Sequence, residues 1–273
     1  MKLAFSTLSC PSWTLERAVT AAREYGYSAI ELRLIDDQTL TPALLRANLE
    51  RVRRAFAGSG IAICGLGSSA RLADNAPERA PHEQELRELI PMAKSLGVPM
   101  IRVFGGNRPA GADEARGITN VAAGLSTVAP MAEDAGVSLL LETHDDFCRS
   151  EVVARVMAQA PSPAVGVIWD SHHPFRHGDS IALTWKNLAP RLKHVHIKDA
   201  RKSPTGKASG WDLVLLGEGE VPVREMLQTL KANGYDGYVS VEWEKRWHPD
   251  IPDPEIALPQ HMAKLREWGL PTR

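Results

Sequence analysis

Four side chains that commonly bind metal ions stand at the ends of four successive β-rich segments in the second half of the chain. Short apolar runs finish in turn on Glu142, Asp170, His196 and Glu242. If these runs are neighbouring parallel strands, their carboxyl ends meet at one edge, where carboxylates would repel each other and take up protons unless a cation joined them. Three carboxylates and one imidazole form a mixed oxygen and nitrogen site that suits Mn²⁺, Mg²⁺, Co²⁺ or Zn²⁺. The pattern predicts one divalent metal ion, with Mn²⁺ the first expectation.

Further polar residues follow these ligands and are expected to take part in the chemistry. His144 and Lys198 each stand two residues beyond a predicted ligand, so side-chain alternation puts them on the same face of the strand. Lys198 is expected to stabilise developing negative charge. His144 and His173 are expected to exchange protons or to hydrogen-bond the substrate. Three other histidines are assigned no such role, His194 as a hydrogen-bonded interior residue and His172 and His177 as surface residues.

A second set of residues is expected to contact the substrate. Glu31 and Arg33 share the polar face of a β-rich segment, and they either line the mouth of the site or form a rim ion pair without a catalytic role. Arg108 follows a pair of glycines that allow close approach of a ligand, and it is expected to pair with an anion. Trp243 is expected to stack on a sugar ring, with core packing as the alternative. The basic stretch 201–207 either meets a carboxylate or phosphate or is a solvated loop.

Short β-rich segments alternate with amphipathic segments along the whole chain, and this order must position the side chains named above. Glycine ends several of the predicted helices, because it readily adopts the left-handed conformation that follows a last helical turn. Eight such units in about 250 residues are typical of a parallel (β/α)₈ TIM barrel with its active site at the C-terminal ends of the strands. An open doubly wound sheet is disfavoured, because no GxGxxG motif follows the first strand. The predicted strands are 3–8, 29–34, 61–66, 100–104, 138–143, 165–170, 194–198 and 238–242, and the predicted helices include 14–25, 42–57, 82–96 and 118–135.

Composition and charge narrow the classes of function. Hydrophobic residues make up 44% of the 273 residues and nothing resembles a linker, so we expect one domain over residues 1–273. A formal net charge of −1 argues against a general nucleic-acid binder. The three scattered cysteines fit a reducing compartment, and the sequence has neither a readable signal peptide nor an apolar run of membrane-spanning length. We expect a soluble, cytoplasmic protein that acts on a small molecule.

The strand endings resemble those of the xylose isomerase-like barrel superfamily. That superfamily includes sugar isomerases and 3-epimerases, inosose isomerases and dehydratases, and endonuclease IV-type repair enzymes. The resemblance implies that Glu142, Asp170, His196 and Glu242 bind the metal, that Glu142 and Glu242 act as an acid/base pair on a carbohydrate, and that the enzyme is a homodimer or homotetramer. It extends over essentially the whole chain and is carried by residues 141–142, 170–173, 194–199 and 241–242 and by the turn 217–220.

The chemistry expected of such a site is proton transfer beside a carbonyl group. A metal chelated by a carbonyl and its neighbouring hydroxyl acidifies the C–H between them and stabilises the enediolate by several kcal/mol. One carboxylate then removes the proton and a second returns one. This predicts a metal-dependent isomerase or epimerase of a sugar, keto-sugar, cyclitol or sugar phosphate. His144, two residues after the first ligand, resembles a feature of dehydroshikimate dehydratases, so a dehydratase or decarboxylase of an oxidised sugar or keto acid is the alternative.

Two further classes are kept as alternatives, a repair phosphodiesterase and a non-catalytic binding protein. The segment 243–249 is more aromatic and basic than is typical of the 3-epimerases, and the sequence has no clear second cluster of histidines and acids. This argues against the trinuclear site of the repair endonucleases and against the two-metal hydride shift of xylose isomerase.

Overall fold

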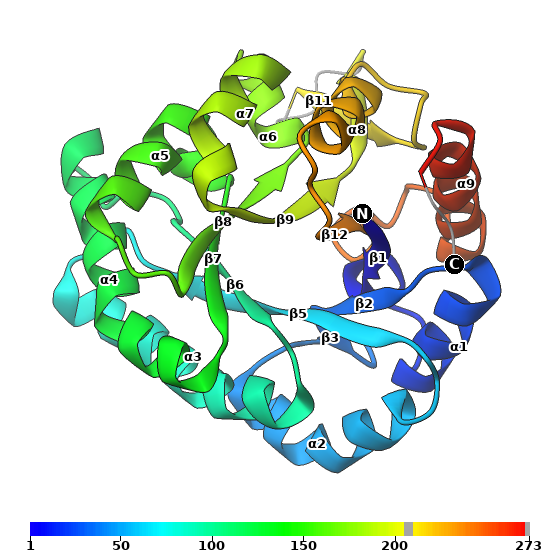
Figure 1. The fold of residues 1–273 in the computed structure, drawn as a ribbon, viewed down its shortest axis with the longest axis horizontal. Helices are drawn as coiled ribbons and strands as arrows, with labels where there is room; N and C mark the ends of the chain where they lie inside the picture. Colours follow the sequence, from blue (N-terminus) through cyan, green and yellow to red (C-terminus); the bar gives the residue numbers. More distant parts are fainter. Residues whose placement is uncertain (205–209, 271–273) are drawn as a thin grey trace.

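The computed structural model describes residues 1–204 and 210–270. Eight parallel strands close into a barrel (Figure 1), in the order β1 (Lys2–Ser6), β12 (Tyr238–Val241), β9 (Leu192–Ile197), β8 (Val165–Asp170), β7 (Ser138–Glu142), β6 (Met100–Phe104), β5 (Ala62–Arg71) and β2 (Ala29–Leu32). The ring is complete, because β1 pairs with both β12 and β2. The predicted (β/α)₈ TIM barrel is therefore confirmed.

Helices surround the barrel in the ring that Figure 1 shows. Several end where the sequence predicted, since Gly26, Gly97 and Gly136 each follow a helix in the left-handed conformation. One helix begins at Ala76 rather than at residue 82, because Pro77 occupies its first turn, where a missing N–H is tolerated. The helices are α1 (Leu15–Tyr25), α2 (Pro42–Phe56), α3 (Ala76–Leu96), α4 (Glu114–Ala135), α5 (Ser150–Gln159), α6 (His172–Arg176), α7 (Ile181–Leu188), α8 (Val223–Ala232) and α9 (Pro254–Glu267), with short 3-10 turns η1 (Thr7–Ser9), η2 (Asp145–Phe147) and η3 (Ala189–Arg191).

The inside of the barrel is apolar at one level and polar at the next. Met100, Leu140 and Ile168 form a buried cluster of their own, separate from the large core between strands and helices. Met100 lies directly against Gly65, where a Cβ atom would come within 2.1 Å of the Met100 Cε. These side chains fill the lumen beneath the C-terminal strand ends, so polar residues that point inward at the next level are held on a packed support.

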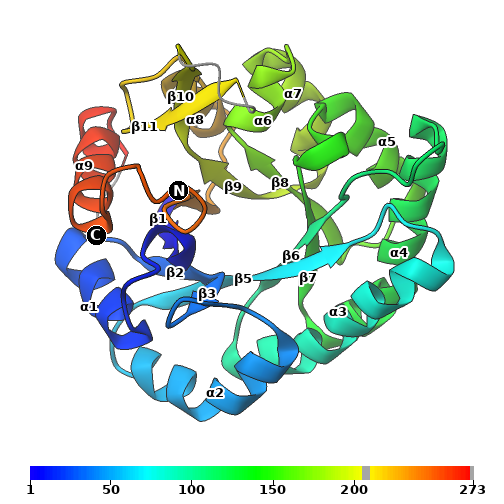
Figure 2. The same cartoon turned by 180° about the vertical axis from the view of Figure 1, so that it is seen from behind.

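Two short hairpins extend beyond the barrel strands, and the sequence did not indicate them. β3 (Leu34–Ile35) pairs with β4 (Gln38–Thr39), so the second predicted strand ran too far. β10 (Asp199–Lys202) pairs with β11 (Trp211–Val214), and Figure 2 shows this hairpin near α6 and α8. The Trp211 ring lies 5.1 Å from that of His172 and 5.9 Å from that of Phe175, so the hairpin packs on α6. Residues 205–207 of the predicted basic stretch lie outside the described residues.

The three cysteines are unpaired and buried, as expected of small core residues. Burial raises the pKa of the Cys148 thiol to about 11, so little reactive thiolate is present near neutral pH. Within the described part of the chain, no helix is both long and apolar enough to cross a membrane. The cytoplasmic location stays a prediction.

A buried histidine on α9 makes the stability of this fold depend on pH. The His261 side chain is fully buried, and its Nδ1 lies 2.6 Å from the carbonyl oxygen of Ala257. Burial lowers the pKa of His261 to about 4, whereas an unfolded histidine titrates near 6.5. Between these values the unfolded chain binds a proton that the folded chain does not, so stability falls as the pH falls. This group is expected to lower the free energy of unfolding by about 3 kcal/mol between pH 6.5 and pH 4.

Replacing His261 with asparagine is expected to remove that part of the pH dependence, because the amide nitrogen can take the place of Nδ1 and does not titrate. Urea unfolding of the wild type and of His261→Asn across this pH range measures the difference, and other acid-sensitive groups cancel in the comparison. Parallel curves for the two proteins would contradict the prediction.

Candidate metal centre

Four side chains converge inside the C-terminal end of the barrel. Glu142 and Asp170 end β7 and β8, His196 lies on β9, and Glu242 directly follows β12. The strand register aligns them, because Asp170 pairs with His196 and His196 pairs with Ser240. One ligand atom from each of the four lies within 4.8 Å of the other three, and all four residues are buried. The structure thus brings together the four residues that the sequence singled out.

The donor atoms of this group fit a divalent metal ion. His196 Nδ1 lies 2.9 Å from Glu142 Oε1 and 3.5 Å from Glu242 Oε1. Glu142 Oε2 and Asp170 Oδ2 are buried beside cations, since Arg102 Nη1 lies 3.4 Å from the first and Lys198 Nζ lies 3.1 Å from the second. Three buried carboxylates this close together repel one another unless positive charge lies among them. Three carboxylates and one imidazole, turned toward one point, are a donor set that first-row divalent metals accept.

Lys198 supplies a buried positive charge beside the centre. Its Nζ lies 2.7 Å from Glu242 Oε2, 3.1 Å from Asp170 Oδ2 and 2.5 Å from Glu244 Oε1, and the residue is only 1% exposed. Burial by itself would lower the pKa of Lys198, but Asp170, Glu242 and Glu244 raise it well above its usual value. The lysine therefore stays protonated and offsets part of the negative charge of the carboxylates.

Arg102 reaches the same carboxylates from β6, and the sequence interpretation missed it. Its Nη1 lies 3.3 Å from Glu242 Oε1 and 3.4 Å from Glu142 Oε2, and its guanidinium stands over the Phe104 ring. The signal was an arginine within the apolar run 100–104, since a buried arginine requires a partner of opposite charge. Arg102 belongs with Lys198 among the cations that balance the centre.

His144 and His173 lie together at the rim of the centre. Their rings are 4.5 Å apart, and His144 Nδ1 lies 2.9 Å from Asp145 Oδ1. The backbone N–H of His173 donates to Asp170 Oδ1 over 2.9 Å. Neither ring nitrogen of His173 has a hydrogen-bond partner within the described ranges, although the residue is 5% exposed. His173 therefore has hydrogen-bonding capacity to offer to a substrate.

His172 is buried, which corrects the expectation that it lies at the surface. It is 4% exposed, because α6 starts directly after β8 and the β10–β11 hairpin covers it through Trp211. With His173, Trp211, Glu244 and other side chains it lines a cavity of about 70 Å³. His177, at the end of α6, is exposed as expected.

Comparison with known proteins identifies the family of this barrel. The model of the family described as xylose isomerase-like TIM barrel matches residues 19–268. The chain belongs to the xylose isomerase-like TIM barrel family. Among curated proteins it is similar to fructoselysine 3-epimerase of Escherichia coli O157:H7, with 28% identity over 127 residues that cover 45% of this chain and 44% of that protein. It is also similar to inosose dehydratase of Clostridium perfringens, with 26% identity over 162 residues that cover 54% of this chain and 52% of that protein. The chain thus matches about half the length of these curated relatives.

Solved structures share the fold over almost the whole of this xylose isomerase-like barrel. The IolI protein with a bound zinc atom has a TM-score of 0.84 at 20% identity, covering 98% of both chains. The 3-keto-D-glucoside 4-epimerase from E. coli has a TM-score of 0.78 at 18% identity, covering 98% of this chain and 99% of that one. At these identities the likeness shows a common fold.

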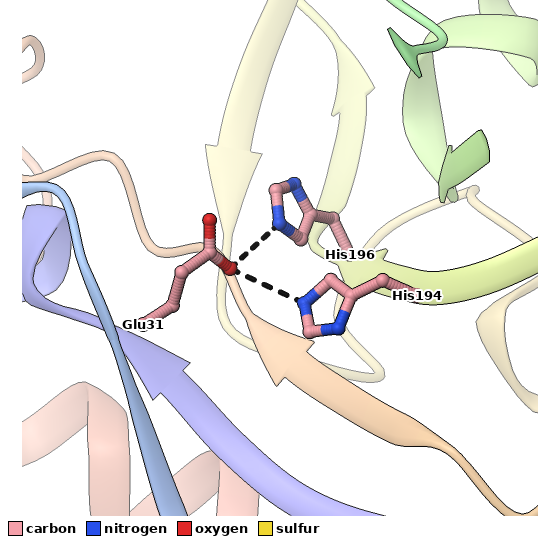
Figure 3. A group of neighbouring side chains, drawn as sticks. All are labelled: Glu31, His194 and His196. Atoms are coloured by element: carbon pink, nitrogen blue, oxygen red, sulfur yellow. Dashed lines mark hydrogen bonds and ion pairs between the residues drawn. The ribbon is translucent and has the colours of Figure 1, made fainter. Parts of the chain in front are cut away.

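Two residues predicted to contact the substrate are buried in this member of the family and do not line the mouth. Glu31 is fully buried, with its Oε2 2.8 Å from His196 Nε2 and 3.2 Å from His194 Nε2 (Figure 3). His194 is thus the hydrogen-bonded interior histidine that the sequence predicted. Trp243 is also fully buried and donates its indole N–H to the carbonyl oxygen of Pro252, so stacking on a sugar is corrected to core packing.

The two predicted arginines lie beyond strand ends and are already engaged. Arg33, 8% exposed, follows β2 and donates to Ser69 Oγ over 2.9 Å; it forms no rim ion pair with the buried glutamate. Burial and the neighbouring Arg102 lower the pKa of Arg33 to about 10. Arg108 follows β6, and its Nε donates to Asp146 Oδ2 over 3.1 Å. Arg33 interacts electrostatically with the centre, because Glu242 and Glu142 raise its pKa and so oppose part of the effect of burial.

The two glutamates of the centre differ in acidity. Burial would raise the pKa of Glu142, but His196 and Arg102 lower it to about 2. Burial raises the pKa of Glu242, Lys198 opposes this shift and the neighbouring Glu142 adds to it, so the net change is upward. Two carboxyl groups whose pKa values are moved apart suit opposite roles in proton transfer.

Proposed function

We propose that this chain is a divalent-metal-dependent isomerase or epimerase of a sugar, keto-sugar, cyclitol or sugar phosphate, acting as one domain over residues 1–273. The observation that carries the proposal is the buried group Glu142, Asp170, His196 and Glu242, in which one possible ligand atom from each residue lies within 4.8 Å of the other three. Family membership and the partial similarity to a sugar 3-epimerase support it. Mn²⁺ is the metal we propose first, because oxygen donors predominate.

Glu142 and Glu242 are proposed to transfer the protons. A divalent ion held by the four side chains would polarise a substrate carbonyl and so acidify the neighbouring C–H. One of the two carboxylates would remove the proton and the other would return one, since both lie at the centre. They extend from β7 and β12, which β8 and β9 separate in the ring, so they can approach a substrate from different sides.

Other residues near the centre are proposed to bind and orient the substrate. Lys198 would stabilise negative charge that develops on oxygen. His173 would donate or accept at a substrate hydroxyl through its ring nitrogens, which have no hydrogen-bond partner among the described residues. Arg33 and Arg108 would pair with an anionic substituent where the substrate carries one. Assembly as a homodimer or homotetramer is proposed from the resemblance and is measured by sedimentation.

A lyase is the second candidate, and His144 is the observation that favours it. Burial would lower the pKa of His144, but Asp145 and Glu142 raise it above its usual value. A histidine at the rim whose protonated form is favoured in this way can donate a proton to a departing hydroxyl group. The partial similarity to inosose dehydratase is consistent with dehydration.

A single assay separates the two candidates. Metal-free protein is reconstituted with Mn²⁺, Mg²⁺, Co²⁺ or Zn²⁺ and incubated in D₂O with keto-sugars, sugar phosphates, cyclitols and β-keto sugar acids, with NMR detection. The proposed function predicts deuterium at the carbon beside the carbonyl without loss of other atoms, and turnover that a chelator abolishes and added metal restores. Release of water or CO₂ would instead assign the lyase reaction. Turnover that is indifferent to metal would contradict both candidates.

A further inference from the structure

Glu31 contacts the centre from across the barrel lumen, and the proposed reaction does not use it. Glu31 lies on β2 and His196 on β9, and both β1 and β12 stand between those strands in the ring. Figure 3 shows His194 and His196 pointing at the same oxygen of Glu31. Both rings reach Oε2 through Nε2, at 3.2 and 2.8 Å. This contact is therefore made by the closed barrel and not by neighbouring strands.

The two nitrogens of the His196 ring face different partners. Nε2 faces Glu31, and Nδ1 faces Glu142 at 2.9 Å and Glu242 at 3.5 Å. A neutral imidazole carries one N–H and one lone pair. If Nε2 carries the proton and donates it to Glu31, the lone pair is on Nδ1, directed at the proposed metal position. Histidines that bind metals commonly donate their second N–H to a carboxylate in this way.

Glu31 has the charge that such a role requires. It is fully buried, its Oε2 faces the two imidazoles (Figure 3), and its Oε1 has no hydrogen-bond partner among the described residues. Both imidazoles lie within hydrogen-bond distance of Oε2, so each can donate an N–H to the Glu31 carboxylate and compensate its burial. A buried anion at this position both orients the His196 ring and makes it a stronger electron donor.

We propose that Glu31 is a positioning residue that fixes the tautomer and orientation of His196, so that Nδ1 binds the metal, with His194 holding Glu31 in place. The inference rests on the proposed function, since it requires a metal at this centre. A second ion bound by Glu31, His194 and His196 is the competing interpretation. It would require both Nε2 atoms to give up their protons and His196 to bridge two ions.

Metal titration tests the role of Glu31 without an assay of turnover. Glu31→Gln keeps the size of the side chain and removes its charge. Calorimetric titration of metal-free protein with Mn²⁺ and Co²⁺ is expected to give one site per chain, with about 10- to 100-fold weaker affinity in the variant. Asp199→Asn is the matched control, because Asp199 is a buried carboxylate that accepts hydrogen bonds from the backbone of Gly217, Gly219 and Val221. Its metal affinity is expected to be unchanged.

A second measurement detects the tautomer of His196 directly. Its first part uses the wild type alone and so does not depend on whether the variant folds. In ¹⁵N-histidine-labelled wild type loaded with Zn²⁺, NMR is expected to show His196 bound through Nδ1 and protonated at Nε2, with slow proton exchange. In Glu31→Gln this N–H resonance is expected to move upfield and to exchange faster. Loss of stability alone would not change which nitrogen binds the metal.

The outcomes are distinguishable. Binding through Nε2, or equal metal affinity of the wild type and Glu31→Gln, would overturn the role of Glu31 while leaving the proposed function intact. If the wild type binds two ions per chain and Glu31→Gln binds one, Glu31 is a ligand of a second metal ion and not a positioning residue. A wild type that binds no divalent metal would overturn the proposed function, and the inference with it.

Discussion

Replacing Glu242 with glutamine is expected to lower turnover by about 10²- to 10⁴-fold, the usual contribution of a positioned general acid or base. Glutamine keeps the volume and one oxygen of the side chain but cannot carry the transferred proton. The fold should persist, because the other three ligands and Lys198 still converge on the site. Glu142→Gln is expected to produce a loss of the same order, because each proton transfer requires a partner.

The measurement is deuterium exchange and product formation by NMR on the substrate found by the panel, at saturating metal. Glu88→Gln is the matched control, since Glu88 is a carboxylate on α3 that pairs with Arg46 at the surface. Metal content is determined for each variant, so that loss of the ion is separated from loss of proton transfer. If Glu242→Gln turns over as fast as Glu88→Gln, the acid/base assignment is wrong.

Replacing Lys198 with methionine is expected to destabilise the metal-free protein by about 3–5 kcal/mol, the usual effect of removing one partner of a buried ion pair. The Lys198 ammonium lies within 3.1 Å of oxygens from Asp170, Glu242 and Glu244, and methionine fills the space without the charge. The carboxylates are then left buried and repel each other.

A bound divalent ion should reduce this loss, because it compensates two of the same carboxylates, Asp170 and Glu242. Urea unfolding with chelator and with saturating Mn²⁺ gives the comparison. Lys264→Met serves as control, since Lys264 pairs with Glu267 on the exposed side of α9 and its removal should change stability by less than about 0.5 kcal/mol. An equal loss for Lys198→Met with and without metal would show that the lysine and the metal do not share these carboxylates.

The barrel was predictable because its signals are local. Apolar β-rich runs alternate with amphipathic helices, and Gly26, Gly97 and Gly136 end helices because each must adopt a left-handed conformation. The four proposed ligands were predictable for a related reason. Parallel strands of a closed barrel end at one rim, so residues at corresponding ends, such as Asp170 and His196, are brought together by the topology itself.

The burial of Trp243 in the core was predictable from its position next to Glu242 in the sequence. Successive residues on a strand point to opposite faces, so an inward Glu242 already turns Trp243 outward, into the packing against α9. Arg102 is similar, since it occupies the inward face of β6, where only a carboxylate partner makes a buried guanidinium tolerable.

Glu31, by contrast, required the folded molecule. Alternation along its strand predicts that it points inward, but not how deep it lies or which residue it meets. Depth depends on the tilt and stagger of eight strands around a closed ring, together with the register shift after Ile30. The same is true of His172, which the β10–β11 hairpin buries from a distant part of the chain. Residue type and facing direction follow from the order of residues along one strand, whereas the partners across the lumen exist only once the ring is closed.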